Sequence, residues 1–180
     1  MLAGVAALRP DAGDVQREVA IAARDLRPGT PLTADDVRME NRSAATLPDG
    51  AHSDIAIIGS TLAGPARRGE VLTDARVLGP RLAGLNAGPD ARVVPLHLAD
   101  AAVLDLIRTG DVVDILGAPS ADANARPRVI ATNAVVVLVS ATAKTIGSSN
   151  DRVVLVALPA SAAHALAGAT LVQTVTLTIH

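Results

Sequence analysis

One segment, Glu18 to Val37, constrains the fold more than any other part of the chain, because a strand and a tight turn follow each other directly within it. From residue 18 to residue 23 the more apolar side chains recur at every second position, which is the period of a β-strand with one apolar face. Pro28 then fixes its own φ at the value that the second position of a turn needs, and Gly29 adopts a positive φ without steric cost. The segment therefore predicts a strand that ends in a turn at these two residues.

A short helix start is predicted after this turn. Thr33 can cap the N-terminus of a helix over residues 34–36, where the helix dipole favours the negative charges of Asp35 and Asp36. We interpret this acidic pair as capping residues, because adjacent carboxylates at a helix start point in different directions and cannot face each other across a catalytic cleft. The chain then leaves the helix as a second strand from Val37.

Part of this pattern recurs later in the chain, since Gly, two residues and then Leu-Thr occur at Gly29 to Thr33 and again at Gly69 to Thr73. With these motifs the stretch from Glu18 to Leu78 resembles the SAF domain, a β-clip module. The words that carry the resemblance are Ala22 to Leu26, Gly29 to Thr33, Asp35 to Val37 and Gly69 to Leu72. The resemblance implies a β-clip over residues 15–78, closed by the second Gly-x-x-Leu.

The composition limits both the core and the partners. Aromatic residues make up 0% of the chain and hydrophobic residues 49%, so the core has to be built from Val, Leu, Ile and Ala. Without aromatic platforms and with a net charge of -2, the chain is not expected to bind nucleic acid. The absence of cysteine excludes thiolate chemistry, disulfides and cysteine-ligated zinc.

A change of composition marks a domain boundary at residues 79–90, where Gly and Pro cluster as in a linker. After it, residues 91–180 predict a second small domain rich in strands. Helices are expected after Asp100, which can cap one, and after Pro159, which a helix tolerates in its first turn. Strands are expected at 92–98, 111–116, 129–131, 134–139, 152–158 and 172–179, with a hairpin-like connection at 148–151. The predicted fold class is therefore mainly β with short helices (α+β), a β-clip SAF domain followed by a second β-rich domain.

Two of these strands carry further signals. Pro95 cannot donate a hydrogen bond to a neighbouring strand, so the strand at 92–98 is expected at a sheet edge or at a bulge. The strand at 134–139 is uniformly apolar, which predicts burial of both its faces. Asp111 and Asp114 lie three positions apart, so on a strand they face opposite sides and are expected to be turn and edge residues.

The second half resembles the RcpC/CpaB domain that follows the SAF module in Flp (tight-adherence) pilus assembly proteins. The matching words are Ile107 to Gly110, Asp111 to Leu116, and the tail from Val153 through Pro159, a helix to Ala169 and a closing strand. Family members carry an N-terminal membrane anchor. The apolar residues Leu2 to Leu8 within the tail 1–14 suit either a frayed amphipathic tail or the remnant of such an anchor, and the resemblance favours the anchor remnant.

Catalytic and metal-binding motifs are not recognisable in the sequence. The four histidines are far apart in sequence and form no zinc-binding pair; they are His52, His97, His164 and His180. Gly59-Ser60 lacks the second glycine of a nucleophile elbow, and the glycines of residues 79–90 are not followed by the Lys and Ser or Thr of a phosphate loop. We therefore predict no catalytic residue, no metal, no cofactor and no enzymatic activity.

Three arginines are the candidate binding residues. Arg67 and Arg68, with Arg24 near them if the clip closes, can grip an anion because guanidinium groups bind carboxylates bidentately. The alternative is a solvated turn without a ligand.

The resemblance implies a non-enzymatic, membrane-anchored pilus assembly factor on the outer side of the cytoplasmic membrane. Its partners are then pilus assembly or secretion proteins, and the cell wall is a further candidate; edge strands would also allow self-association. SAF modules occur in two other settings, which give the alternatives. One is a flagellar P-ring chaperone, which would fit a cleaved signal peptide, and the other is a sugar-acid-binding module that serves an enzyme.

Overall fold

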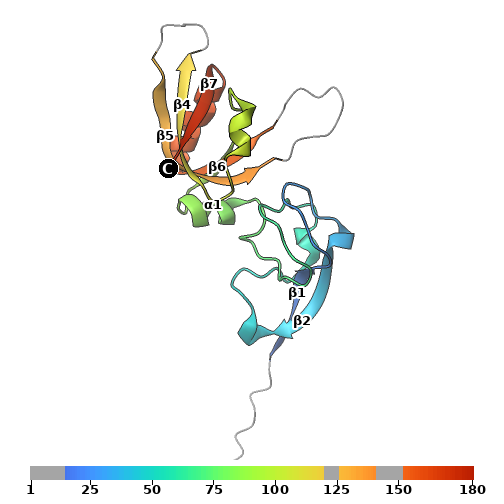
Figure 1. The fold of residues 1–180 in the computed structure, drawn as a ribbon. Coiled ribbons are helices and arrows are strands. Elements are labelled where there is room, and N and C mark those ends of the chain that lie inside the picture. The colour runs from blue at the N-terminus through green and yellow to red at the C-terminus, as the bar shows by residue number, and fades with distance from the viewer. Residues whose placement is uncertain (1–14, 120–125, 141–151) are drawn as a thin grey trace, which may run out of the picture.

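The computed structural model describes residues 15–119, 126–140 and 152–180. These residues form a two-stranded sheet and a five-stranded sheet, each with its own hydrophobic core. We call the part with the first sheet, residues 15–78, the N-terminal domain and the described part from residue 91 onward the C-terminal domain. Figure 1 shows the two domains at opposite ends of the molecule, with helix α1 (Pro80–Ala87) between them. The predicted fold class, mainly β with short helices, is confirmed.

In the N-terminal domain, strands β1 (Gln16–Ala22) and β2 (Val37–Ser43) pair antiparallel, from Gln16 opposite Ser43 to Ala22 opposite Val37. The second half of β1 is buried on both faces, which differs from the predicted single apolar face. The reason is that other segments of the clip cover it. Three 3-10 helices complete the domain: η1 (Ala34–Asp36), η2 (Ala44–Thr46) and η3 (Ile55–Ile57).

The second Gly-x-x-Leu closes the clip along the other edge of β1. Gly69 N donates to Ala22 O (2.8 Å), and Leu72 N donates to Ala20 O (2.9 Å). Gly29 has the positive φ that its turn predicts, 84°, and Gly69 has the same conformation, with a φ of 83°. Behind this clip lies an aliphatic core of Ala20, Ala22, Leu26, Leu32, Ile57, Leu62, Ala66, Leu72 and Val77.

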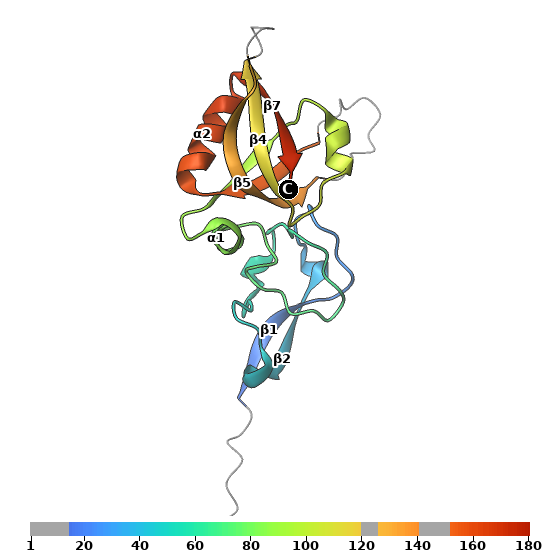
Figure 2. The ribbon, with the colours of Figure 1, turned by 60° about the vertical axis from the view of Figure 1, so that its left-hand side comes forward.

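The linker at 79–90 contains a helix that the sequence analysis did not predict. Helix α1 begins directly after Gly79 with a proline, which is tolerated in the first turn of a helix, and it ends at Gly88, whose φ is 93°. It buries Ala83 and packs against strands of the C-terminal domain (Figure 2). The segment between the domains is thus a packed structural element.

The C-terminal domain is one antiparallel sheet with the strand order β3-β6-β5-β4-β7. Its elements are β3 (Arg92–Leu96), η4 (Ala101–Asp105), β4 (Val112–Pro119), β5 (Arg128–Val139), β6 (Val154–Leu158), α2 (Ala160–Thr170) and β7 (Gln173–Ile179). Strand β3 is an edge of the sheet, as Pro95 predicts. Just beyond β3, Leu98 forms a parallel bridge with Val175 of β7, so the two edges of the sheet meet at this point.

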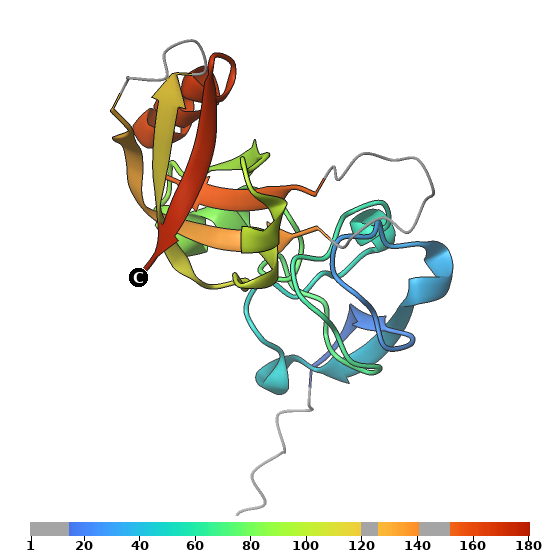
Figure 3. The ribbon, with the colours of Figure 1, turned by 45° about the horizontal axis from the view of Figure 1, so that its top comes forward.

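Two predicted elements of this domain differ in the structure. The helix after Asp100 is only the short 3-10 helix η4, although the Asp100 side chain caps it as predicted by accepting from Ala102 N (2.8 Å). The strands predicted at 129–131 and 134–139 are one strand, β5, which bends strongly (Figure 3). Its interruption is an irregularity at Asn133, whose φ is 54° and whose N–H donates to Asp114 Oδ1 (3.0 Å). The hairpin predicted at 148–151 lies outside the described residues.

Helix α2 covers the sheet and contributes Ala163 and Leu166 to its core. The strand predicted at 172–179 is β7, in which Val175 and Leu177 are buried while Thr174, Thr176 and Thr178 are exposed. Most of the residues from 134 to 139 are buried, as their uniformly apolar sequence predicts.

The packing around Gly117 generates a prediction about stability. A Cβ atom at this buried position would overlap Ile130 Cδ1 and lie 2.6 Å from Gln173 Oε1, whereas one at Gly168 in α2 would meet nothing within 4 Å. Ile130 and Gln173 are half-buried and their side-chain ends can rotate away in part, so Gly117→Ala is expected to lower the free energy of unfolding by about 1 kcal/mol. Gly168→Ala should raise it by roughly 0.5–1 kcal/mol through helix propensity.

Urea denaturation of both variants, followed by circular dichroism, measures these changes. Equal stability of the Gly117→Ala variant and the unmodified chain would contradict the close packing of β4 against Ile130 and Gln173.

Candidate binding sites

A buried carboxylate holds together the turn and the helix start of the clip. Asp36 Oδ2 accepts from Thr33 N (2.9 Å) and from Thr33 Oγ1 (2.7 Å), which forms a capping box on η1. Its other oxygen, Oδ1, accepts from Arg24 Nε (2.7 Å) and lies 2.6 Å from Arg24 Nη2. The hydrogen bonds from Thr33, with a smaller contribution from the Arg24 guanidinium, hold the pKa of Asp36 below its usual range. The capping role predicted for this residue is therefore confirmed.

A second, exposed carboxylate joins the two halves of the clip. Asp25 Oδ1 accepts from the backbone N–H of Arg68 (2.9 Å), and Asp25 Oδ2 accepts from Arg67 Nη1 (2.7 Å). The backbone hydrogen bond from Arg68, together with the side-chain hydrogen bond from Arg67, lowers the pKa of Asp25. Both side chains of the ion pair are mostly in solvent, with exposed fractions of 86% for Arg67 and 61% for Asp25.

The three predicted binding arginines therefore have different environments. The clip brings Arg67 and Arg68 to Asp25, which directly follows Arg24 in the chain. Arg24 and Arg67 form ion pairs with carboxylates of the same domain. Of the three, only the Arg68 side chain has no ion-pair partner in the described part of the chain. Ligand binding at these arginines stays a prediction.

A pocket of about 410 Å³ opens beside Arg24, and the sequence analysis did not identify it. Its charged lining consists of two arginines and two aspartates, so its charges balance. The lining residues are Arg24, Asp25, Leu26, Arg27, Thr30, Leu32 and Asp36. The signal for this pocket in the sequence was Asp25, the acidic residue directly after Arg24. Its carboxylate supplies the counter-charge for Arg67 in the other half of the clip.

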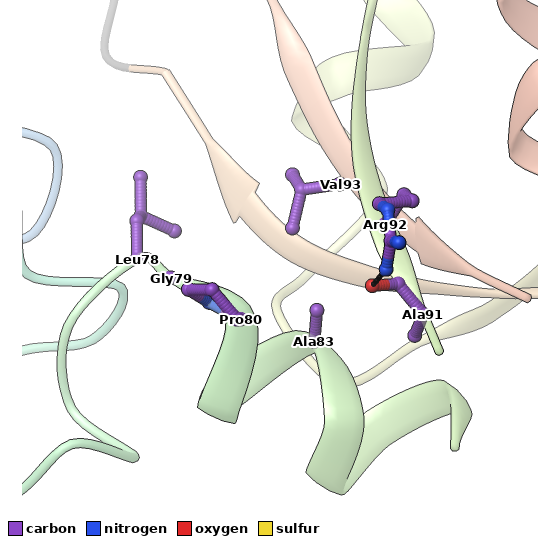
Figure 4. A pocket seen from close by; sticks show the side chains of 7 residues that line it. All are labelled: Leu78, Gly79, Pro80, Ala83, Ala91, Arg92 and Val93. Carbon is purple, nitrogen blue, oxygen red and sulfur yellow. Dashed lines mark hydrogen bonds between the residues drawn. The ribbon is translucent and has the colours of Figure 1, made fainter. Parts of the chain in front are cut away.

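A larger pocket of about 560 Å³ lies between α1 and β3 (Figure 4). Its lining is mostly apolar and comprises Leu78, Gly79, Pro80, Ala83, Ala91, Arg92 and Val93. Arg92, its one charged lining residue, donates from Nη1 to Asp90 O (2.8 Å) and Ala91 O (3.0 Å). The sequence analysis missed this pocket because one wall is the unpredicted helix.

The remaining histidines and aspartates of the sequence analysis form no recognisable metal site. Within residues 15–119, 126–140 and 152–180, no group of three or more His, Asp or Glu side chains is arranged to hold a metal ion. His180 Nε2 lies 3.0 Å from Asp114 Oδ1, the carboxylate that also accepts from Asn133 N. Asp111 Oδ2 accepts from Arg108 N (2.7 Å) in the turn before β4. Asp111 thus acts as the predicted turn residue. The predicted edge position is wrong for Asp114, because β4 lies between β5 and β7, and its carboxylate instead holds the irregular position of β5 at Asn133.

The contacts of Asp36 generate a pH-dependent prediction. Asp36→Asn removes the charge that Thr33 and Arg24 stabilise, so it should lower the free energy of unfolding by about 2 kcal/mol at neutral pH. Because the folded-state pKa is lowered, the stabilisation by Asp36 is fully present above the usual carboxyl pKa and is lost as the pH falls through the lowered value. The stability difference between the two proteins should therefore shrink in acid.

Chemical denaturation at neutral pH and at a series of acidic pH values measures this difference. Asp35→Asn is the matched control, because Asp35 is exposed on the same helix turn, and it should change stability by less than about 0.5 kcal/mol. A difference for Asp36→Asn that stays constant down to the acid transition would contradict the assigned role.

Comparison with known proteins addresses the N-terminal domain. A family model for the SAF domain matches residues 17–78, which include the clip, both glycine turns and the three candidate binding residues Arg24, Arg67 and Arg68. No curated protein and no solved structure matches the chain. Residues 17–78 are therefore a SAF domain.

Proposed function

We propose that the chain is a non-enzymatic assembly factor of a Flp (tight-adherence) pilus, acting by contacts with other proteins or with the cell wall. The observation that carries the proposal is the order of its parts, a SAF domain followed directly by a separate β-rich domain. The elements of the second domain coincide with the words that resemble the RcpC/CpaB domain. The turn at Thr109-Gly110 precedes β4, and Pro159 leads into α2 and the closing strand β7.

The charge arrangement in the clip supports a protein contact over capture of a small anion. Arg24 and Arg67 are already compensated by Asp36 and Asp25, and the pocket beside Arg24 has equal numbers of arginines and aspartates. A small carboxylate entering this pocket would have to displace these ion pairs and would meet two negative charges. A partner protein can instead contact a single exposed arginine side chain from outside the pocket, without displacing these ion pairs.

We further propose that the protein acts on the outer side of the cytoplasmic membrane, held there by its N-terminal segment. This location follows from the resemblance and from the apolar residues Leu2 to Leu8, which lie outside the described residues. In the described parts of the chain, no helix has the length and apolar character needed to cross a bilayer.

The first test is cross-linking mass spectrometry in the native host with the full-length gene product. We expect cross-links to pilus secretion components or to pilin, with linked sites on the described domains. Cross-links to a flagellar ring protein would contradict the pilus role and favour the chaperone alternative. Cross-links to a soluble enzyme would favour the binding-module alternative.

The second test is direct titration with sugar acids by calorimetry, because the pocket beside Arg24 and Arg27 is the feature that favours the binding-module alternative. We expect no saturable binding, since the aspartates of the pocket oppose a carboxylate. Saturable binding that Arg27→Ala abolishes and Arg128→Ala leaves intact would contradict the proposal. Arg128 is a suitable control because it is exposed on β5, in the other domain.

A further inference from the structure

Strand β2 presents an edge that no backbone segment of the described chain pairs with. At the two ends of the β1–β2 ladder, Ala44 N donates to Val15 O (2.8 Å) and Ala23 N donates to Asp36 O (2.9 Å). Because hydrogen-bonded positions alternate along an antiparallel pair, the even-numbered residues of β2 face β1. The backbone N–H and C=O groups of Val37, Met39 and Asn41 therefore point away from β1, and among the described residues no bridge or backbone hydrogen bond reaches them from another segment.

The edges of the C-terminal sheet are protected, whereas this one is not. Strand β3 carries Pro95, and β7 is bridged by Leu98. Strand β2 contains no proline and no lysine, and its register with β1 is regular over seven residue pairs. Figure 2 shows β1 and β2 at the end of the molecule that lies away from the five-stranded sheet. Native proteins usually block long regular edges by proline, bulges or charged side chains, and of these β2 has only charged side chains of mixed sign, so its edge is open to a strand of complementary charge.

The charges on β2 complement a second copy of the same strand. Arg38, Glu40 and Arg42 alternate with Val37 and Met39, which pack on the aliphatic core of the clip. Within the strand, Glu40 forms ion pairs with Arg38 (2.8 Å) and Arg42 (2.7 Å).

The pairing register that suits these charges places Met39 opposite Met39 of an antiparallel second strand. Arg38 then lies opposite Glu40 of the other copy, and Glu40 opposite its Arg38. These two positions are non-hydrogen-bonded pairs, in which opposite side chains approach most closely. The outward-pointing groups of Val37, Met39 and Asn41 all find backbone partners in the same register.

We propose that the SAF domain pairs through the β2 edge with a second copy of this chain, antiparallel and with Met39 on the two-fold axis, to form a continuous sheet across two molecules. This inference does not depend on the proposed pilus role, since it rests on the geometry and charges of β2 alone. The interface is small, so association in the micromolar to millimolar range is expected.

Sedimentation velocity of the full chain over this concentration range, recorded with interference optics, measures the association. Glu40→Arg creates a strip of three arginines, and the double variant Arg38→Glu/Arg42→Glu creates a strip of three glutamates. Each variant alone should associate at least tenfold more weakly than the unmodified chain. An equimolar mixture of the two should regain association, because every facing pair is then oppositely charged.

The matched control is Asp90→Arg, which makes the same charge change as Glu40→Arg at an exposed residue of the linker and should leave association unchanged. Circular dichroism establishes that all variants are folded. A chain that stays monomeric up to millimolar concentration would overturn the proposal. So would unchanged association of the Glu40→Arg variant, or a monomeric mixture of the two folded variants.

Disulfide cross-linking tests the register, because the chain has no cysteine of its own. Met39→Cys places two thiols on the two-fold axis, where the Cα separation of about 5.5 Å suits a disulfide. Oxidation should therefore yield a covalent dimer. Asn41→Cys is the control and should cross-link poorly, since residue 41 then lies opposite Val37. Cross-linking at residue 41 in preference to residue 39 would overturn the register.

Discussion

The N-terminal domain depends on the hydrogen bonds that β1 makes along both of its edges. On one edge β1 pairs with β2, and on the other it bonds to the segment from Gly69 to Leu72. This central position explains why the second half of the strand is buried on both faces. It also brings Asp25, just after the strand, to the backbone N–H of Arg68. The core of the clip and the arrangement of its arginines thus follow from one strand that is held between two others.

Local signals in the sequence predicted the elements whose cause is local. Pro28 and Gly29 specify a turn by their own conformational preferences, and Thr33 with Asp36 specifies a helix start through its capping box. Helix α1 was not predicted, because the segment 79–90 is rich in the Gly and Pro that are typical of linkers. The burial of the helix comes from its contacts with β3, β5 and β6 of the C-terminal domain. The two pockets were missed for a similar reason. Each is formed between segments that only the tertiary structure brings together.

The two domains differ in whether the backbone groups at their sheet edges are paired. In the clip, Arg24 is paired with Asp36 of the same half, and Arg67 is paired with Asp25 of the other half. Strand β2 nevertheless keeps unpaired backbone groups in the described structure. In the C-terminal domain the sheet edges are closed or blocked, while an irregular position at Asn133 bends β5 and is held by Asp114. Among the described strands, the edge of β2 is therefore the one left open for the proposed backbone pairing.

The wholly aliphatic cores have a practical consequence for spectroscopy. Because the chain contains no Phe, Tyr or Trp, it contributes almost no near-ultraviolet absorbance and no intrinsic fluorescence. Any aromatic signal in a mixture with a candidate partner belongs to the partner, and its change on mixing reports binding without a label. At the same time, the buried Val, Leu and Ile methyl groups of both cores experience no ring-current shifts from Phe, Tyr or Trp of the chain itself, so they are sensitive probes for such side chains brought in by that partner.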